Sequence, residues 1–486
     1  MAVHDEDAPG KKAQTDEQRA FHGGDGRSSA PPAGSFDPMT LETKSLALLQ
    51  EALRELEHGF DDLPRFDGEL SEAELERVRA VLLEVAPRMR DNFPYPHPMY
   101  VGQMLKPPHP IARVAYQLAQ WVNPNNHALD GGRASSAMEK EAVAAIAAMF
   151  GWPTHLGHLT GGGTMANLEA LWVAGKLRPG ATILASSIAH YTHARLSQVL
   201  GLSFEEVPVD ARGRMDLDAL RDRIRRGGVG TVVATMGTTM LGSVDPLPAI
   251  LALAREHELR VHADAAYGGY FTLAEGLEQD TRAAFEALAG VDSLAIDPHK
   301  HGLQPYGCGC VLFRDASVGA LYRHDSPYTY FSSAELHLGE ISLECSRAGA
   351  AAVALWATQR LLPLERGGRF AEGLTRCRRA ALALAGKLSA GPRWRLALAP
   401  ELDIVVWAPR EATASATSKR TQAIFRDAAA EGLHLAVARL PRALLAERWN
   451  GFAWDEDEVA CLRSCLIKPE HADWVDRIFE TLESVA

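Results

Sequence analysis

Long apolar runs, an excess of positive charge and clusters of cysteine are all missing from this 486-residue sequence. No apolar run is long enough to cross a membrane as a helix, and no apolar stretch typical of a signal peptide occurs near residue 1. The net charge of −12 argues against a protein that binds nucleic acid through its phosphates. The six cysteines show no metal-ligand spacing, and Cys308 and Cys310 are too close for an unstrained disulfide within one strand. We therefore expect a cytoplasmic protein with reduced cysteines, no metal, and neither membrane nor nucleic acid as a partner.

The composition that remains is typical of a globular protein, with 47% hydrophobic and 23% charged residues. Residues 1–40 have little apolar surface and predict a disordered tail. Residues 41–122 predict a helical segment, because apolar residues recur at helical spacing and charged residues cover the other faces. Residues 123–365 predict a large domain and residues 366–486 a small α+β domain. The amphipathic N-terminal helices have no compact partner of their own, so we expect them to pack on another domain or subunit.

Strand-like and helix-like stretches alternate between Thr154 and Phe313, which favours a mostly parallel α/β sheet. The predicted strands are Thr182–Ala185, Thr231–Ala234, Arg260–Ala263, Leu294–Ile296 and Gly309–Phe313. We also expect Ser135 and Ser136 to cap the helix that runs through Glu139 to Phe150. Ligands of such sheets bind at the carboxyl ends of the strands, so the residues there should form one site if the protein has one.

Chemically useful residues do follow these strands. Lys300 lies on a short turn between two apolar runs, where partial burial and two neighbouring histidines would suit an amine nucleophile. Taken alone, this stretch favours an ordinary turn lysine. Thr160-Gly-Gly-Gly-Thr164 opens a helix and is suited to hold a phosphate. Asp264 ends a buried strand, and His190 offers a flat ring. Each has a structural explanation taken singly: a turn lysine, a glycine-rich loop, a capping carboxylate and a core histidine. Together they match what pyridoxal 5′-phosphate requires: a phosphate cradle, a stacked ring, a protonated ring nitrogen and a Schiff-base lysine.

These motifs resemble the group II pyridoxal-phosphate-dependent decarboxylases, which act on aromatic amino acids, histidine, glutamate or cysteine sulfinate. The resemblance covers residue 40 or so to the C-terminus. It is carried by Leu159–Asn167, Ala189-His190, Ala234–Asp245, His262–Gly269 and, above all, Asp297-Pro-His-Lys300. It implies the fold of aspartate aminotransferase (fold type I) and a homodimer with active sites at the subunit interface. One departure is that Thr164 and Met165 stand where many members have Ser and Glu. Thr keeps the hydroxyl, so we expect phosphate binding to survive.

The resemblance also implies roles for individual residues. Lys300 would form the Schiff base, Asp264 would pair with the ring nitrogen, and His190 would stack on the ring and assist proton transfer. The implied cofactor-binding residues are Gly163, Thr164, His190, Thr239, Asp264, Ala266, His299 and Lys300. The family's loop tyrosine corresponds to Tyr328 or Tyr330, of which Tyr328 is preferred. Arg463 would hold a substrate carboxylate, and His97 lies in an aromatic, proline-rich segment that would line the substrate pocket.

The predicted reaction is therefore decarboxylation of an L-amino acid to the amine and carbon dioxide, through an external aldimine and a quinonoid. Two rivals remain at this point. One is a carbon–carbon lyase or a decarboxylating aldehyde synthase on the same fold, and the other is a non-catalytic protein that keeps the fold. The sequence leaves the substrate open, because Arg463 suits an acidic side chain or only the α-carboxylate, while the aromatic residues at 93–100 favour an aromatic substrate or merely form a wall.

Overall fold

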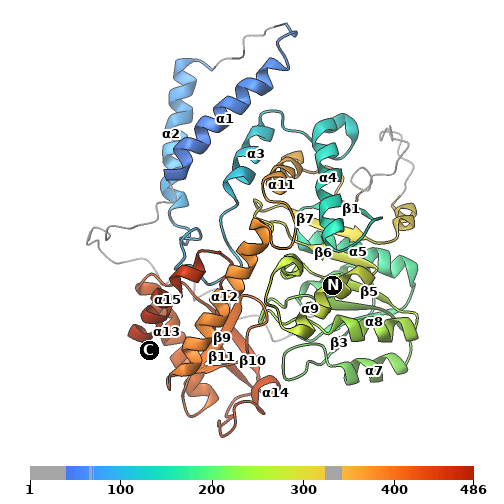
Figure 1. Cartoon of the computed structure of the whole chain (residues 1–486), viewed down its shortest axis with the longest axis vertical. Helices are drawn as coiled ribbons and strands as arrows, with labels where there is room; N and C mark the ends of the chain where they lie inside the picture. Colours follow the sequence, from blue (N-terminus) through green and yellow to red (C-terminus); the bar gives the residue numbers. More distant parts are fainter. Residues whose placement is uncertain (1–39, 65–67, 69, 323–341) are drawn as a thin grey trace, which may run out of the picture.

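The computed structural model describes residues 40–486, except 65–67, 69 and 323–341. Nearly all of the predicted tail, and both candidate loop tyrosines, Tyr328 and Tyr330, lie outside the described residues. Figure 1 shows a body built on a large sheet and a smaller sheet, with two helices projecting away from it. No described helix is long and apolar enough to span a membrane.

The larger sheet has seven strands in the order β1-β7-β6-β5-β4-β2-β3. Their bounds are β1 Leu156–Thr160, β2 Thr182–Ser186, β3 Phe204–Val207, β4 Val229–Thr235, β5 Arg260–Asp264, β6 Ser293–Ile296 and β7 Gly309–Phe313. The pairs among β2 to β6 are parallel, and β7 runs antiparallel to both β6 and β1. Strand β1 therefore points the same way as β6, so the ends of β1, β2, β4, β5 and β6 share one edge.

Both faces of this sheet are covered, as a parallel sheet requires. Alternate residues of β6 belong to different apolar clusters: Leu294 and Ile296 pack in one and Ala295 in another. The covering helices include α4 Arg133–Met149, α5 Gly163–Leu177, α6 Thr192–Leu200, α7 Leu217–Arg225, α8 Leu247–Glu256, α9 Gln279–Glu286 and α11 Gly349–Leu361. Short 3₁₀ turns occur at Leu129–Gly131, Gly269–Leu273, Ala287–Gly290 and Ala316–Leu321. The predicted α/β class is confirmed.

Two strands and one helix cap differ from the sequence-based expectation. The segments that form β1 and β3 were not predicted as strands. In β1 the polar His158 interrupts the apolar pattern, and it is buried because its ring bonds to Glu169 Oε2 at 2.9 Å. The prediction that Ser135 and Ser136 cap α4 is wrong, because Gly132 holds that position. Ser135 instead lies within the first turn and donates to Asn126 Oδ1.

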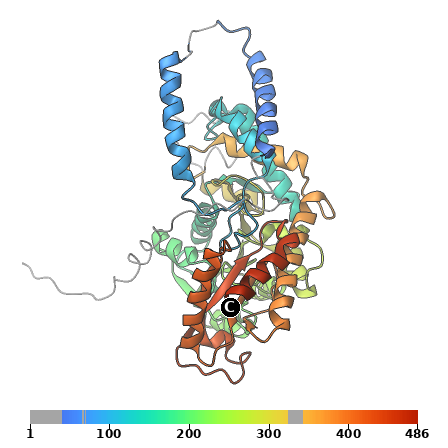
Figure 2. The same ribbon diagram turned by 90° about the vertical axis from the view of Figure 1, so that its left-hand side faces the viewer.

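Helices α1 (Thr40–His58) and α2 (Glu72–Met89) project from the body, and α3 (Pro110–Gln120) lies between them and the sheet (Figures 1 and 2). A capping box formed by Ser71 and Glu74 starts α2. No residue of α2 is buried, and its exposed apolar residues include Leu75, Val78, Leu82 and Val85. This helix therefore gains nothing from packing within the chain that is described.

The smaller sheet is antiparallel, in the order β10-β11-β9-β8. Its strands are β8 Trp394–Leu396, β9 Ile404–Pro409, β10 Ala436–Pro441 and β11 Glu458–Cys465. The helices of this part are α12 Arg369–Ala390, α13 Ala414–Ala430, the short α14 Arg442–Leu445 and α15 His471–Val485. The buried Trp394 and Trp407 lie in the cluster between this sheet and its helices. All of these elements lie within the range predicted as the small domain.

Candidate active site

A cavity of about 400 Å³ opens at the shared edge of the larger sheet. Residues after β1, β2, β4, β5 and β6 line it, although they are far apart in the chain. The lining includes Gly161 to Thr164, His190 to Thr192, Thr235, Gly237, Thr239, Asp264, Ala266, Tyr267, Asp297, His299 and Lys300. Every residue predicted to bind cofactor therefore lies on the wall of one cavity.

Lys300 is held by the residue that ends its strand. Its Nζ lies 3.0 Å from Oδ2 of Asp297, and its backbone N–H donates to the carbonyl of Asp297. Asp297 is buried and follows β6 directly. Gly163, at the start of α5, packs against the same carboxylate, since a Cβ at this position would lie 2.7 Å from Asp297 Oδ2. Glycine is therefore required where the helix start approaches the lysine turn.

Asp264 is buried at the end of β5 and pairs with a histidine that the sequence analysis did not single out. His193 Nε2 lies 2.8 Å from Asp264 Oδ2. Burial by itself would raise the pKa of Asp264, but the hydrogen bond and charge of His193, with the charge of Lys300, outweigh it and lower the pKa. The carboxylate is thus kept ionised, as a partner for a protonated ring nitrogen must be.

His193 was missed although a signal was present. It follows His190 by three residues, lies in the first turn of α6, and donates its backbone N–H to the carbonyl of His190. His190 itself is half-buried, its Nδ1 is hydrogen-bonded to Thr192 Oγ1, and burial lowers its pKa. The imidazole that lines the cavity is therefore held in place by the helix that follows it.

The start of α5 lies where the sequence predicts a phosphate cradle. Gly162 precedes the helix with φ of 151°, and no side chain caps the first turn. The first N–H groups of a 15-residue helix therefore face the cavity with the positive end of its dipole. Glu344 accepts from the N–H of Gly161, which lies just outside this turn.

Buried polar atoms without hydrogen-bond partners are a second reason why the lining of this cavity fits pyridoxal phosphate. Thr235 Oγ1, Asp297 Oδ1 and His299 Nδ1 are buried atoms with no hydrogen-bond partner among the described residues. Buried polar atoms are normally satisfied, so these atoms fit a polar ligand in the cavity. An anion-binding helix start, a buried carboxylate and an amine on one wall are the groups that this cofactor needs.

The two predicted substrate-binding residues lie outside this wall. Arg463, on β11, is buried and donates to the carbonyls of Thr239, Met240 and Gly102. It therefore braces the segment that contains Thr239. The ring of His97 packs on Trp474 with centroids 5.1 Å apart, and its Nδ1 accepts from the N–H of Met99. The structure does not bring His97 to the cavity, and its role in substrate binding stays a prediction.

Comparison with protein families agrees with this geometry. Residues 173–408 match the model of the pyridoxal-dependent decarboxylase conserved domain. A probable L-tyrosine/L-aspartate decarboxylase of Methanothermobacter thermautotrophicus is 31% identical over 320 residues, which cover 63% of this chain and 82% of that protein. An L-tyrosine decarboxylase of Enterococcus faecium is 28% identical over 385 residues, covering 58% of this chain and 63% of that protein.

Solved structures share the fold over nearly the whole chain. The crystal structure of mouse CSAD in apo form has a TM-score of 0.72 and 21% identity, covering 92% of this chain and 99% of that one. The structure of Oryza sativa TDC with PLP and tryptamine has a TM-score of 0.72 at 18% identity, covering 94% and 100%. At these identities the likeness establishes the fold, and it includes the elements on either side of the cavity.

Proposed function

Because the chain belongs to the pyridoxal-phosphate-dependent amino-acid decarboxylases of group II, we propose that the cavity around Lys300 is its active site and that its substrate is an aromatic L-amino acid, with L-tyrosine as the first candidate. Decarboxylation with pyridoxal phosphate is the activity of the family. The lyase, aldehyde-synthase and non-catalytic alternatives are not favoured by any of the relatives described above.

Each wall of the cavity has a task in this proposal. The bound cofactor supplies an aldehyde that bonds to amines and a ring that takes up the electron pair left by departing carbon dioxide. Lys300 contributes the amine, and Asp297 positions it. Asp264, kept ionised by His193, holds a proton on the ring nitrogen. Gly163, Thr164 and His299 bind the phosphate, His190 covers the ring face, and Thr239 and Ala266 line its edge.

One observation favours an aromatic over an acidic substrate. Among the described residues that line the cavity, Lys300 is the only lysine or arginine. Arg463, predicted from the sequence to hold a substrate carboxylate, already donates to three carbonyls. A buried carboxylate without a cationic partner is costly, so a substrate with a second carboxylate finds little compensation here. The planar rings of Tyr191 and Tyr267 are better suited to an aromatic side chain.

The test is carbon dioxide release by the purified holoenzyme from L-tyrosine, L-phenylalanine, L-tryptophan, L-aspartate and L-glutamate. We expect kcat/KM for L-tyrosine to exceed that for L-aspartate by about a hundredfold or more. L-Aspartate is the second candidate, since several relatives are named for it. Equal or greater efficiency with L-aspartate would overturn the substrate proposal. Aldehyde and ammonia, measured in the same reactions, distinguish a synthase from a decarboxylase.

The proposal also includes assembly and location. We propose a homodimer held in part by α1 and α2, supported by the exposed apolar residues of both helices. We propose a cytoplasmic location, supported by six cysteines that are all unpaired. The proposed domain limits are those given by the sequence: a tail to residue 40, a helical segment to 122, the cofactor domain to 365 and the small domain to 486. Tyr328 or Tyr330 remains the proposed proton donor, and L-tyrosine turnover by Y328F and Y330F would identify which one acts.

A further inference from the structure

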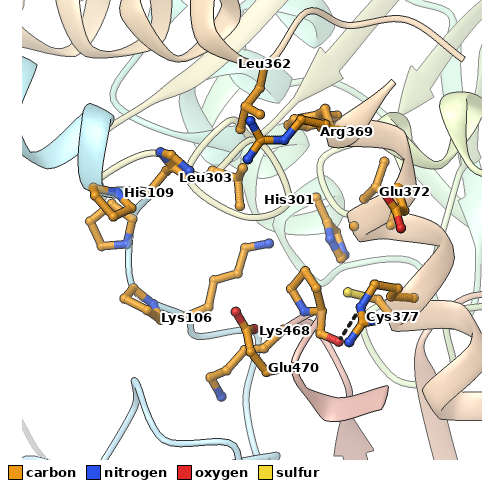
Figure 3. A pocket seen from close by; sticks show the side chains of 18 of the residues that line it. Lys106, His109, His301, Leu303, Leu362, Arg369, Glu372, Cys377, Lys468 and Glu470 are labelled. Atoms are coloured by element: carbon orange, nitrogen blue, oxygen red, sulfur yellow. Dashed lines mark hydrogen bonds between the residues drawn. The ribbon is translucent and has the colours of Figure 1, made fainter. Parts of the chain in front are cut away.

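A second cavity, of about 630 Å³, is shown in Figure 3. Its walls come from the segment before α3, the first half of α12, and the turn between β11 and α15. Lys300 faces the active-site cavity, whereas the next residue, His301, lines this one. The two cavities therefore share a turn but no lining residue, so the second is a separate site.

The wall of the second cavity combines apolar surface with cations. Pro107, Leu303, Leu362, Phe370 and Leu374 contribute apolar atoms. The basic residues of the lining are Lys106, His109, Arg113, His301, Arg369, Arg376 and Lys468, whereas its carboxylates are Glu372 and Glu470. Both glutamates are exposed, while His301 and Lys468 are buried. The two carboxylates, like Arg369, therefore lie nearer the solvent than His301 and Lys468 do.

Two lysines in this wall form no ion pair with any carboxylate that the structure describes. Lys106 points into the cavity in Figure 3, and its Nζ donates to the carbonyl of Ile467 at 3.3 Å. Lys468 Nζ donates to the carbonyl of Tyr100 at 2.6 Å. In the part of the chain that the structure describes, the lysines that form ion pairs are Lys300 and Lys387. An ammonium held in low-polarity surroundings with no carboxylate in contact favours binding of an anion.

Two further basic side chains, Arg369 and His301, face the same space. Figure 3 shows the guanidinium of Arg369, from the first turn of α12, directed into the cavity from the side opposite Lys106. His301 is held at the far wall by Asp403, with Nε2 3.2 Å from Oδ2. Cationic groups on opposite walls, separated by apolar side chains, suit a ligand with an apolar body and a charged end.

We propose that this cavity binds a small organic carboxylate with an apolar body, held chiefly by Lys106 and Arg369. The site is independent of the amino-acid substrate, because none of its residues lines the active-site cavity. Its volume falls in the range of small-molecule pockets.

Binding should be linked to proton uptake. Burial lowers the pKa of Lys106, and burial together with the charge of Lys106 lowers that of Lys468 to about 7. A bound carboxylate favours the charged amines, so protons are taken up near neutral pH. The titratable groups that act on these two amines, besides each other, are His97, His301, Cys377, Asp403, Cys465, Glu470 and His471.

The experiment is calorimetric titration of the holoenzyme with 2-naphthoate and with its uncharged amide. We expect the carboxylate to bind at least about tenfold more tightly than the amide, with proton uptake revealed by different heats in two buffers. K106Q should weaken 2-naphthoate binding about tenfold or more, and K106R should retain it. K419Q, at an exposed lysine on α13, is the matched control and should bind as the parent does.

Three results would overturn the proposal: no binding at millimolar 2-naphthoate, equal affinity for the amide, or undiminished affinity in folded K106Q. If K106Q does not fold, R369Q serves as the second variant, with the same expected loss. Retained affinity in R369Q then overturns the proposal. If 2-naphthoate bound in the active-site cavity instead, its affinity would be unchanged in both K106Q and R369Q. The two variants therefore distinguish the two cavities.

Discussion

At the scale of single residues, the site depends on pairs rather than on isolated groups. Lys300 is paired with Asp297, and Asp264 with His193. Sequence reasoning found the first member of each pair, because lysine and aspartate at strand ends are recognisable. It missed the second member, because a partner is defined by distance in space. Asp297 entered only as part of the Asp297-Pro-His-Lys300 motif, without a role of its own, and His193 was not considered.

Replacing Lys300 by Ala tests the first pair. We expect activity to fall more than about a hundredfold, together with loss of the visible absorption of the bound cofactor, because the amine that bonds to it is gone. The control is K176A, at the far end of α5, which should keep both the activity and the visible absorption. A K300A enzyme that retains full activity would contradict the assignment.

Replacing His193 by Gln tests the second pair. His193 lowers the pKa of Asp264, so its removal should raise that pKa. The carboxylate would then be protonated at higher pH, and the acid limb of the kcat profile should move to higher pH. Cofactor affinity, measured by fluorescence titration of the apoenzyme, should fall about tenfold. An unchanged pH profile would show that His193 has only a structural role.

At the scale of elements, close packing at the carboxyl edge of the sheet restricts which residues fit. Gly268 follows β5, and a Cβ there would lie 1.9 Å from the carbonyl oxygen of Met236. Gly386, in α12, has no atom within 4 Å of the corresponding position. The local sequence does not show which glycine has room for a side chain. That difference depends on Met236, which follows the neighbouring strand β4.

These glycines form a matched pair of substitutions. G268A should lower the free energy of unfolding by about 1–3 kcal/mol, because the backbone must shift to admit the methyl group. G386A should stabilise the protein by up to about 1 kcal/mol, because Ala is the better residue in an exposed helix interior. Urea denaturation with the cofactor present measures both. A neutral G268A would mean that the turn after β5 shifts at little cost.

At the scale of the whole molecule, the projecting helices stand out. Leu75 and Leu82 on α2 are exposed, although burial of each by a partner surface would contribute about 1.5–3 kcal/mol. The proposed homodimer supplies such a surface, whereas the single chain does not. Figure 2 shows α1 and α2 extending well beyond the body, where another subunit can pack between or against them.

The double substitution L75E/L82E should therefore convert the dimer to a monomer, as measured by light scattering during size-exclusion chromatography. Activity should fall with it if the active site is completed at the subunit interface. L382E, at an exposed leucine on α12, is the control and should leave the mass unchanged. A monomeric parent protein, or a variant that remains dimeric, would contradict the proposal that α2 forms part of the subunit interface.

The sequence by itself determined the fold class, the family, the cofactor and eight residues that line one cavity. It could do so because strand ends, a glycine-rich helix start and the Asp297-Pro-His-Lys300 turn are local patterns that directly reflect backbone geometry and chemistry. The tertiary structure alone decided the partners: His193 for Asp264, three carbonyls for Arg463, and Asp403 for His301, which had no role in the sequence. It also decided that Lys106 and Arg369 face one cavity. Such pairings join segments that are up to hundreds of residues apart, and no local pattern encodes them because they arise only when separate elements pack together.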